Sequence, residues 1–251
     1  MAVNTWQRDG EKRWWSKTIF TGAVLAVALL PIGALGSRVG LWSFGTGFML
    51  LAVGVMMSCV VLVTGIAGLI AARRHGLAPD KPGLWISVAL SVAVLALMGM
   101  QFYRAVTVPP IHNISTDVDD PPQFDRVIAL RGDEANPLHY DAAELADTQQ
   151  RAYPWVRTLE TELPPEQALE RAAEVLEAQG LELVNVDPTA GRVEAVDTTF
   201  WFGFKDDVVV RVRPGPGGSR VDVRSVSRVG RSDLGTNAAR IGEFLEAFRN
   251  D

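Results

Sequence analysis

Three long runs without a charged residue occupy most of the first 103 positions of this chain. The runs are Thr18–Ser37, Val39–Ala72 and Pro82–Tyr103, and everything after Arg104 has the mixed pattern of a water-soluble domain. A helix needs roughly 20 apolar residues to cross a bilayer, and backbone inside lipid must satisfy its own hydrogen bonds. The pattern therefore predicts three transmembrane helices, with the second span near Gly47–Ala71.

Lysine and arginine are distributed unevenly between the flanks of these runs. Seven of them precede the first run or separate the second from the third, whereas only Arg38 and Arg104 lie on the opposite side. Cytoplasmic loops carry an excess of these cations. We therefore predict a multi-pass protein of the bacterial inner (cytoplasmic) membrane, with a cytoplasmic N-terminus and an extracytoplasmic, periplasmic C-terminal domain. Tryptophans are enriched at the headgroup level of membranes. In this chain they lie just before or near the start of the runs: Trp6, Trp14, Trp15, Trp42 and Trp85.

The first run has an alternative interpretation as a cleaved signal peptide. It has a basic start, an apolar stretch, and small residues at Ala34 and Gly36. Cleavage would leave two spans and keep the domain on the same side. The single cysteine, Cys59, lies in the second run, so the domain must depend on its core rather than on an internal disulfide.

The polar pattern after the third run divides the rest of the chain. Val108–Gln123 is rich in proline and aspartate, which favours an extended linker holding the domain away from the bilayer. The predicted organisation is a cytoplasmic N-terminus at 1–17, a three-helix membrane region at 18–104, a linker at 105–123 and an extracytoplasmic domain at 124–251.

Helical and alternating patterns succeed one another within this domain. Short turns between the later runs favour antiparallel pairing. We predict an α+β two-layer sandwich, with helices on one face of an antiparallel sheet of about four strands. The predicted helices are Asp141–Arg151, Glu166–Gln179 and Gly235–Arg249. A short strand is predicted at Phe124–Arg131, and the four main strands at Leu181–Val186, Arg192–Thr199, Asp207–Arg213 and Arg220–Val229.

Alternation assigns side chains to the two faces of the sheet. Val208, Val210 and Val212 share one face, and Arg211 and Arg213 point to the other. The last strand divides in the same way, with Val221, Val223, Ser225 and Ser227 opposite Arg220, Asp222, Arg224 and Arg228.

Charge is also uneven along the domain. Arg104–Asp187 holds 6 cations and 17 anions, whereas Lys205–Arg240 holds 8 cations and 4 anions. Cross-strand ion pairs are one explanation of the basic stretch. Nucleic acid as a partner is disfavoured by the predicted location and by the whole domain, which has 16 cations and 26 anions.

Several motifs from Val193 onwards resemble one family. They are Gly203-Phe204-Lys205-Asp206-Asp207, Arg224-Ser225-Val226-Ser227-Arg228 and Ser232-Asp233-Leu234-Gly235-Thr236-Asn237, with Phe124-Asp125-Arg126 and Tyr153-Pro154 upstream. Together they are similar to the bacterial and plastid family known as domain of unknown function 1499, over about residues 120–250. That family has no established activity, so the resemblance implies a fold-level grouping and no mechanism.

The second and third motifs contain the candidate binding residues. Three arginines precede the last predicted helix and Arg240 lies in its second turn, while Asp233 or Thr236 could cap its start. Helix starts favour anions, and arginines bind phosphate or carboxylate through paired contacts. We predict an anionic-ligand site at Arg224, Ser225, Ser227, Arg228, Arg231, Asp233, Asn237 and Arg240, with Glu194, Asp206, Asp207 and Arg211 as secondary candidates. Alternatively, Arg224 and the aspartates 206, 207 and 233 pair with one another to fix the strand–helix junction.

Four aromatic residues are concentrated in Phe200-Trp201-Phe202-Gly203-Phe204. The favoured interpretation is core beneath a turn. Contact with the outer bilayer surface and the wall of a ligand pocket are the alternatives.

Motifs for catalysis, metals and cofactors are absent from the sequence. His75, His112 and His139 are too scattered for a metal site, and no CxxC, Walker or GxSxG motif occurs. We expect no catalytic residue, metal or cofactor. The leading function is non-catalytic binding of an anionic cell-envelope component, such as a membrane lipid headgroup or small ligand, or of an envelope protein. The alternatives are an enzyme using Asp206, Asp207 or Asp233, and a structural membrane scaffold.

Overall fold

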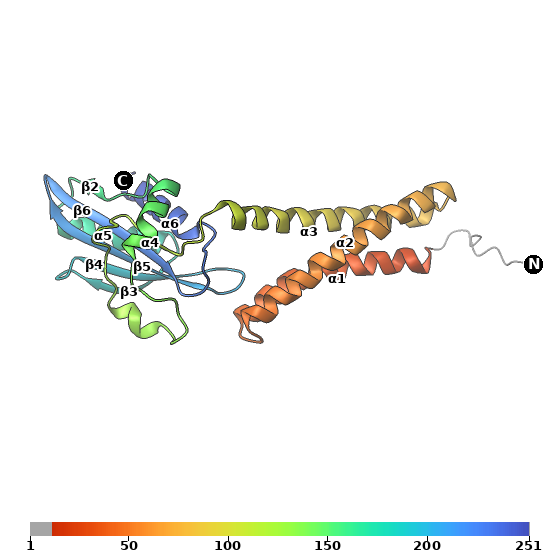
Figure 1. Cartoon of the computed structure of the whole chain (residues 1–251), viewed down its shortest axis with the longest axis horizontal. Coiled ribbons are helices and arrows are strands. Elements are labelled where there is room, and N and C mark those ends of the chain that lie inside the picture. Colours follow the sequence, from red (N-terminus) through yellow and green to blue (C-terminus); the bar gives the residue numbers. More distant parts are fainter. Residues whose placement is uncertain (1–11, 251) are drawn as a thin grey trace, which may run out of the picture. The chain divides into compact units, whose positions relative to one another are not determined.

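The computed structural model describes residues 12–250 of this chain, which form two units. The first unit holds the long helices up to Tyr103 together with residues 201–203, and the second holds the remainder from Arg104 onwards (Figure 1). Trp6, one of the tryptophans given above, and Arg8, one of the seven cations counted above for orientation, lie outside the described residues.

The first unit contains three helices that are long and apolar enough to cross a membrane. They are α1 (Trp14–Arg38), α2 (Phe44–Arg74) and α3 (Lys81–Thr107), with the short 3₁₀ helix η1 (Ala78–Asp80) leading into α3. The prediction of three long apolar helices before the sheet is confirmed, and their insertion in a membrane stays a prediction.

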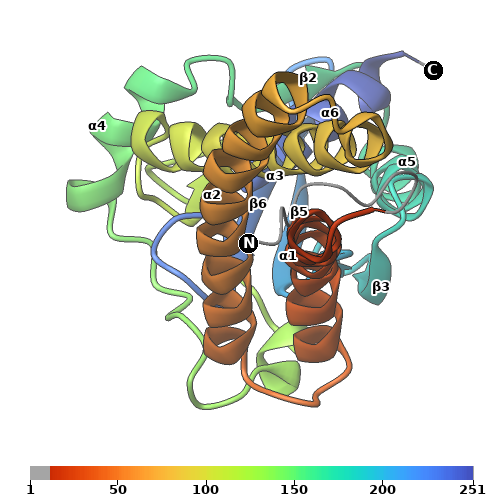
Figure 2. The ribbon, with the colours of Figure 1, turned by 90° about the vertical axis from the view of Figure 1, so that its right-hand side faces the viewer.

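Glycine allows α1 and α2 to lie side by side (Figure 2). A Cβ atom on Gly33 would lie 2.8 Å from the carbonyl oxygen of Gly47, and a Cβ atom on Gly54 would lie 3.0 Å from that of Ala26. Such backbone contact is the usual role of small residues between apolar helices. The Trp42 indole donates a hydrogen bond to the Gly33 carbonyl at 3.0 Å and so fixes the connection between the two helices.

The second unit is an antiparallel sheet with helices. Its strand order is β1-β6-β5-β4-β3, and β2 also pairs with β6, so the sheet has six strands and the predicted number of about four is wrong. The strands are β1 (Asn113–Ser115), β2 (Leu159–Thr161), β3 (Glu182–Asp187), β4 (Arg192–Thr198), β5 (Lys205–Gly215) and β6 (Gly218–Ser227). The helices are η2 (Arg126–Leu130), α4 (Ala142–Ala152), α5 (Pro165–Ala178) and α6 (Thr236–Arg249).

The additional strands correct the predicted linker. Strand β1 lies within Val108–Gln123 and pairs with β6, with Ile114 opposite Ser225. Ile111 and Ile114 are buried in the main core, so this segment is part of the domain rather than an extended spacer. Composition suggested a linker because proline and aspartate are common in linkers, but here they flank a three-residue edge strand.

Alternation in β5 and β6 divides the sheet into two faces, as predicted. Val208 and Val223 lie in the main core with Leu176 of α5 and Phe244 of α6, so the two helices cover this face, termed here the helix face. The opposite face, termed here the loop face, is covered by residues 116–140.

The short strand predicted at Phe124–Arg131 is wrong, because residues 126–130 form the 3₁₀ helix η2. Val127 of η2 packs against Val209 on the loop face, in a second, smaller core. The loop face is therefore closed rather than exposed to solvent as in a simple two-layer sandwich.

Candidate functional site

The predicted site residues lie on opposite faces of the sheet and do not form one cluster. Asp206, Ser225, Ser227, Asn237 and Arg240 meet on the helix face. The loop face holds Glu194, Asp207, Arg211, Arg224 and Arg228. Asp233 caps α6, and Arg231 is exposed in the β6–α6 connection.

Arg240 is the centre of the helix-face cluster. Its Nη2 donates to Asp206 Oδ2 at 2.8 Å and also to Asp197, a residue that the sequence analysis did not select. Its Nη1 donates to Ser225 Oγ at 2.9 Å and to Asn237 Oδ1 at 2.6 Å. Asp197 and Asp206 face each other across β4 and β5, so the guanidinium neutralises two adjacent carboxylates.

The start of α6 is fixed by side chains of the same cluster. Asp233 accepts hydrogen bonds from the backbone N–H groups of Gly235 and Asn237, each at 2.8 Å. Of the two capping candidates, Asp233 and Thr236, it is therefore Asp233 that binds the start of α6, although the N-cap position itself is Gly235. Burial raises the pKa of Asp233 above its ordinary value, although these two hydrogen bonds oppose the shift. The Asn237 amide donates to Ser227 Oγ and to the His112 carbonyl, which joins α6 to the segment before β1.

Arg224 is completely buried on the loop face, and its hydrogen-bond partners are uncharged. The guanidinium donates to Asn113 Oδ1 and to the Pro122 carbonyl at 3.0 Å each, and to the Leu138 carbonyl. Its Cζ lies 5.3 Å from the centre of the Phe124 ring, within the range of a cation–π interaction. Burial lowers the pKa of Arg224 to about 10. This arginine therefore fastens three segments to β6.

Asp207 and Glu194 are also completely buried on the loop face. Asp207 accepts hydrogen bonds from Arg228 at 2.7 Å and from Arg131. The predicted alternative, in which Arg224 pairs with the aspartates, is therefore wrong, because other arginines bind Asp207 and Arg224 binds uncharged groups. Glu194 binds no cation; its carboxylate accepts from the backbone N–H groups of Asp125 and Arg126 at 2.7 and 3.0 Å and from Val127 at 3.4 Å. It therefore holds the start of η2.

Arg211 belongs to a five-charge network at the other end of the loop face. With Arg213 it binds the fully buried Asp222, at 3.1 and 2.8 Å respectively. Both arginines also bind Asp117 and Asp120, in the segment predicted as a linker. Periodicity identified the arginines, but Asp117 and Asp120 lie 91 to 96 residues away along the chain and gave no local signal.

The aromatic segment joins β4 to β5 as a short, tightly bonded loop. Thr199 N–H donates to the Phe204 carbonyl at 2.8 Å, and Phe204 N–H donates to Thr199 Oγ1 at 2.9 Å. Phe200 is 68% exposed and Trp201 is 54% exposed, so the favoured interpretation as core beneath a turn is wrong for these two residues.

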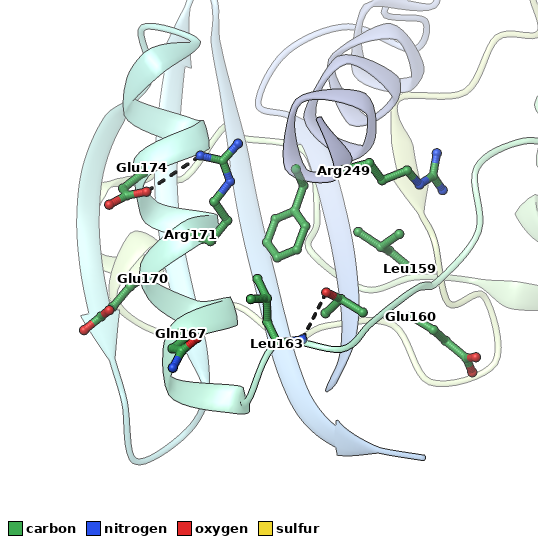
Figure 3. A pocket seen from close by; sticks show the side chains of 10 residues that line it. Leu159, Glu160, Leu163, Gln167, Glu170, Arg171, Glu174 and Arg249 are labelled. Carbon is green, nitrogen blue, oxygen red and sulfur yellow. Dashed lines mark hydrogen bonds and ion pairs between the residues drawn. The ribbon is translucent and has the colours of Figure 1, made fainter. Parts of the chain in front are cut away.

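A cavity of about 420 Å³ opens between α5, β2 and the end of α6, as Figure 3 shows. Leu159 and Leu163 provide apolar wall, and Arg171 projects into it from α5. The Arg171 guanidinium donates to the Ala247 carbonyl at 2.8 Å and lies 3.8 Å from the Glu174 carboxylate. None of these residues was selected from the sequence, because the three segments meet only after folding.

The described residues, 12–250, contain no group of three or more His, Cys, Asp or Glu side chains placed to hold a metal ion. The carboxylates of the helix face are instead occupied by Arg240 and by the start of α6. The cavity between α5, β2 and α6 has both apolar and charged walls.

No curated protein matches this chain. The resemblance seen in the motifs is confirmed, and the match begins earlier than residue 120, at Asn113, where β1 begins. The family model described as protein of unknown function (DUF1499) matches residues 113–248, more than half of the sequence, and the chain belongs to that family.

Proposed function

We propose that this protein is a three-span membrane protein whose C-terminal domain, held outside the cytoplasm, is a non-catalytic module that binds a partner protein at the cavity between α5, β2 and α6. The observation that carries the proposal is this cavity of about 420 Å³, which has apolar walls and charged residues at its rim. Its volume is within the range of about 300–1,000 Å³ that is usual for binding pockets.

A binding role for the predicted arginines is less well supported by their contacts. Arg224 binds carbonyl groups, Arg228 binds Asp207, and Arg240 is neutralised by two aspartates. An incoming phosphate or carboxylate would have to displace these buried partners, which is costly. Arg231 is exposed, but a single surface arginine offers little specificity.

Catalysis by the candidate aspartates is disfavoured for the same reason. Asp206 and Asp207 are each paired with buried arginines, which occupy the lone pairs that a general base needs. Asp233 accepts two backbone hydrogen bonds at the start of α6. These contacts support a structural role.

The chemistry around the cavity indicates the kind of partner segment. Its rim carries three glutamates and two arginines, and the whole domain has 26 anions against 16 cations. The exposed side of α5 carries four glutamates, Glu166, Glu170, Glu174 and Glu177. A segment with an apolar side chain next to lysine or arginine fits these walls, and the acidic surface would favour its approach.

Position-specific photocrosslinking in membranes of cells that make the full chain tests this proposal. A photoreactive residue replaces Gln167, which lines the cavity, or, as the control, Arg126, whose side chain is 72% exposed on the loop face. We expect a discrete protein adduct at position 167 and none at 126. The adduct should disappear when Glu170→Lys and Glu174→Lys reverse the rim charge. Equal adducts at both positions, or an adduct that survives charge reversal, would overturn the proposal.

The topology has a separate test. A phosphatase that is active only outside the cytoplasm and a fluorescent protein that folds only inside are each fused after Asp251. Because the cations are concentrated on the predicted cytoplasmic side, we expect activity only from the phosphatase fusion. Fluorescence without phosphatase activity would reverse the proposed orientation.

A further inference from the structure

We propose that the β4–β5 aromatic loop and the β6–α6 connection form a surface that enters the headgroup region of the bilayer. This inference rests on the proposal that α3 crosses the membrane, but it is independent of the cavity and of its partner.

Strand directions bring the relevant loops to one end of the sheet. Because neighbouring strands are antiparallel, the end of β4, the start of β5, the end of β6 and the start of β1 lie together, as the pairs Thr198–Lys205, Asp206–Ser227 and Asn113–Val226 show. The aromatic loop joins the first two of these points, and the β6–α6 connection leaves from the third.

The chain that leaves α3 is attached to this same end. Helix α3 ends at Thr107, and six further residues, reaching at most about 20 Å, lead to Asn113. Within the second unit, Asp233 N–H donates to the Ile111 carbonyl at 3.4 Å. A Cβ on Gly235 would lie 3.6 Å from Val108. If α3 emerges from the bilayer near Tyr103, this end of the domain is restricted to the vicinity of the membrane surface.

The exposed apolar side chains at this end suit that surface. Phe200 is 68% exposed, and Val229 and Leu234 in the β6–α6 connection are each 39% exposed. The exposed Arg231 lies between the last two and could bind a lipid phosphate. Aromatic rings concentrate at the headgroup level, where one edge is apolar and the other hydrated. The two hydrogen bonds between Thr199 and Phe204, one of them accepted by the Thr199 hydroxyl, hold Phe200 on a preformed loop.

Lipid-based quenching of a fluorophore tests the inference in the full chain, reconstituted in vesicles of phosphatidylcholine and phosphatidylglycerol. Cys59→Ser first removes the native cysteine. The fluorophore is then attached to a new cysteine at Val229→Cys or, as the control, at Pro216→Cys, which lies at the opposite end of the sheet between β5 and β6. Lipids carry the quencher near the headgroup. We expect quenching at 229 to exceed that at 216 by at least about twofold, as for a segment lying in the interface. In Phe200→Ser/Trp201→Ser, quenching at 229 should fall to the value at 216, with thermal unfolding unchanged.

Equal quenching at 229 and 216, or quenching at 229 that the double substitution leaves unchanged, would overturn the inference. A label on the native Cys59, which is exposed on α2, provides the insertion control. Quenching of that label by lipids that carry the quencher deep in the acyl chain would support a spanning helix, whether or not the label at 229 is quenched. Its absence would overturn the three-span proposal itself, so the two failures are distinguishable.

Discussion

Glu194 of β4 and Arg224 of β6 lie in one cross-strand row, with Val209 of β5 between them, and both side chains are completely buried. Two strand spacings separate their Cα atoms by about 10 Å, so the two charges do not form a contact pair. Each is satisfied by neutral groups: Glu194 by backbone N–H groups of η2, and Arg224 by carbonyl groups and an amide. The two side chains therefore hold the segments that cover the loop face: Glu194 binds the start of η2, and Arg224 binds the chain at Pro122 and Leu138.

Arg224→Leu should destabilise the domain strongly. The substitution leaves the Pro122 and Leu138 carbonyls and the Asn113 amide oxygen buried without a donor. Each unsatisfied group costs about 1–3 kcal/mol, so we expect the free energy of unfolding to fall by about 3–5 kcal/mol. Chemical denaturation of the full chain in detergent measures this change. Arg220→Leu in the same strand is the control, since that side chain is 50% exposed. Equal losses in both variants would contradict the role of Arg224.

Glu194→Gln should loosen η2 while leaving the sheet intact. Both carboxylate oxygens of Glu194 accept hydrogen bonds from backbone N–H groups. In glutamine an NH₂ group replaces one of these oxygens, so a donor would face a donor. We expect a local cost of about 1–3 kcal/mol. Hydrogen exchange of residues 122–130 in the full chain measures it as faster exchange. The control, Glu182→Gln at the exposed end of β3, should leave this segment unchanged. Unaltered protection in the Glu194 variant would refute the prediction.

Asp206 and Arg240 should be energetically coupled. Removing Arg240 leaves Asp197 and Asp206 adjacent and without their shared cation. A double-mutant cycle with Asp206→Asn and Arg240→Gln should therefore be non-additive by about 1–3 kcal/mol. Thermal and chemical unfolding of the four chains gives this value. A parallel cycle with Arg240→Gln and Glu246→Gln should be additive within about 0.5 kcal/mol. Additivity in the first cycle would show that the helix-face cluster is not coupled.

Asp233→Asn should change how stability depends on pH. Burial raises the pKa of Asp233 in the folded chain above its ordinary 3.8, so the folded state holds this proton more tightly than the unfolded state. The contribution of Asp233 to stability is therefore greatest below pH 3.8 and is lost as pH rises through the folded pKa. Asparagine keeps one of the two accepting oxygens and does not titrate, so the hydrogen bond that it loses costs the same at every pH. We expect the melting temperature of the variant, relative to the parent, to increase between pH 4 and pH 7. A constant or decreasing difference would contradict the raised pKa.

Regular elements of the fold were predictable where the pattern extends over several turns or alternations. Helices α5 and α6 and strands β3 to β6 each carry enough periodic apolar positions to identify them, and alternation assigned the faces of β5 and β6 correctly. Strands β1 and β2 have only three residues each, too few for alternation to appear. Helix η2 depends on Glu194, which is 67 to 69 residues away along the chain.

Candidate-site residues were harder to predict, because sequence proximity is not proximity in a sheet. Arg224 and Ser225 are adjacent in the chain yet point to opposite faces, so a motif that contains both cannot form one pocket. The cavity of Figure 3 instead uses side chains from three segments, and its lining residues have no common pattern. Charge counts allowed ion pairs within the domain as one explanation, but they did not indicate which carboxylates bind which arginines.

The position of β6 near the end of the chain also limits when the domain can fold. Asn113 of β1 pairs with Val226, and the Asn113 side-chain oxygen accepts a hydrogen bond from the Arg224 guanidinium. Strand β1 therefore cannot pair until more than 100 further residues have been synthesised. Contacts between distant residues slow folding, because the intervening loop must close first. During synthesis, residues 113–140 would therefore emerge before the strand that buries them. This interval would expose their apolar side chains to chaperones and proteases, and the speed of synthesis would set its length.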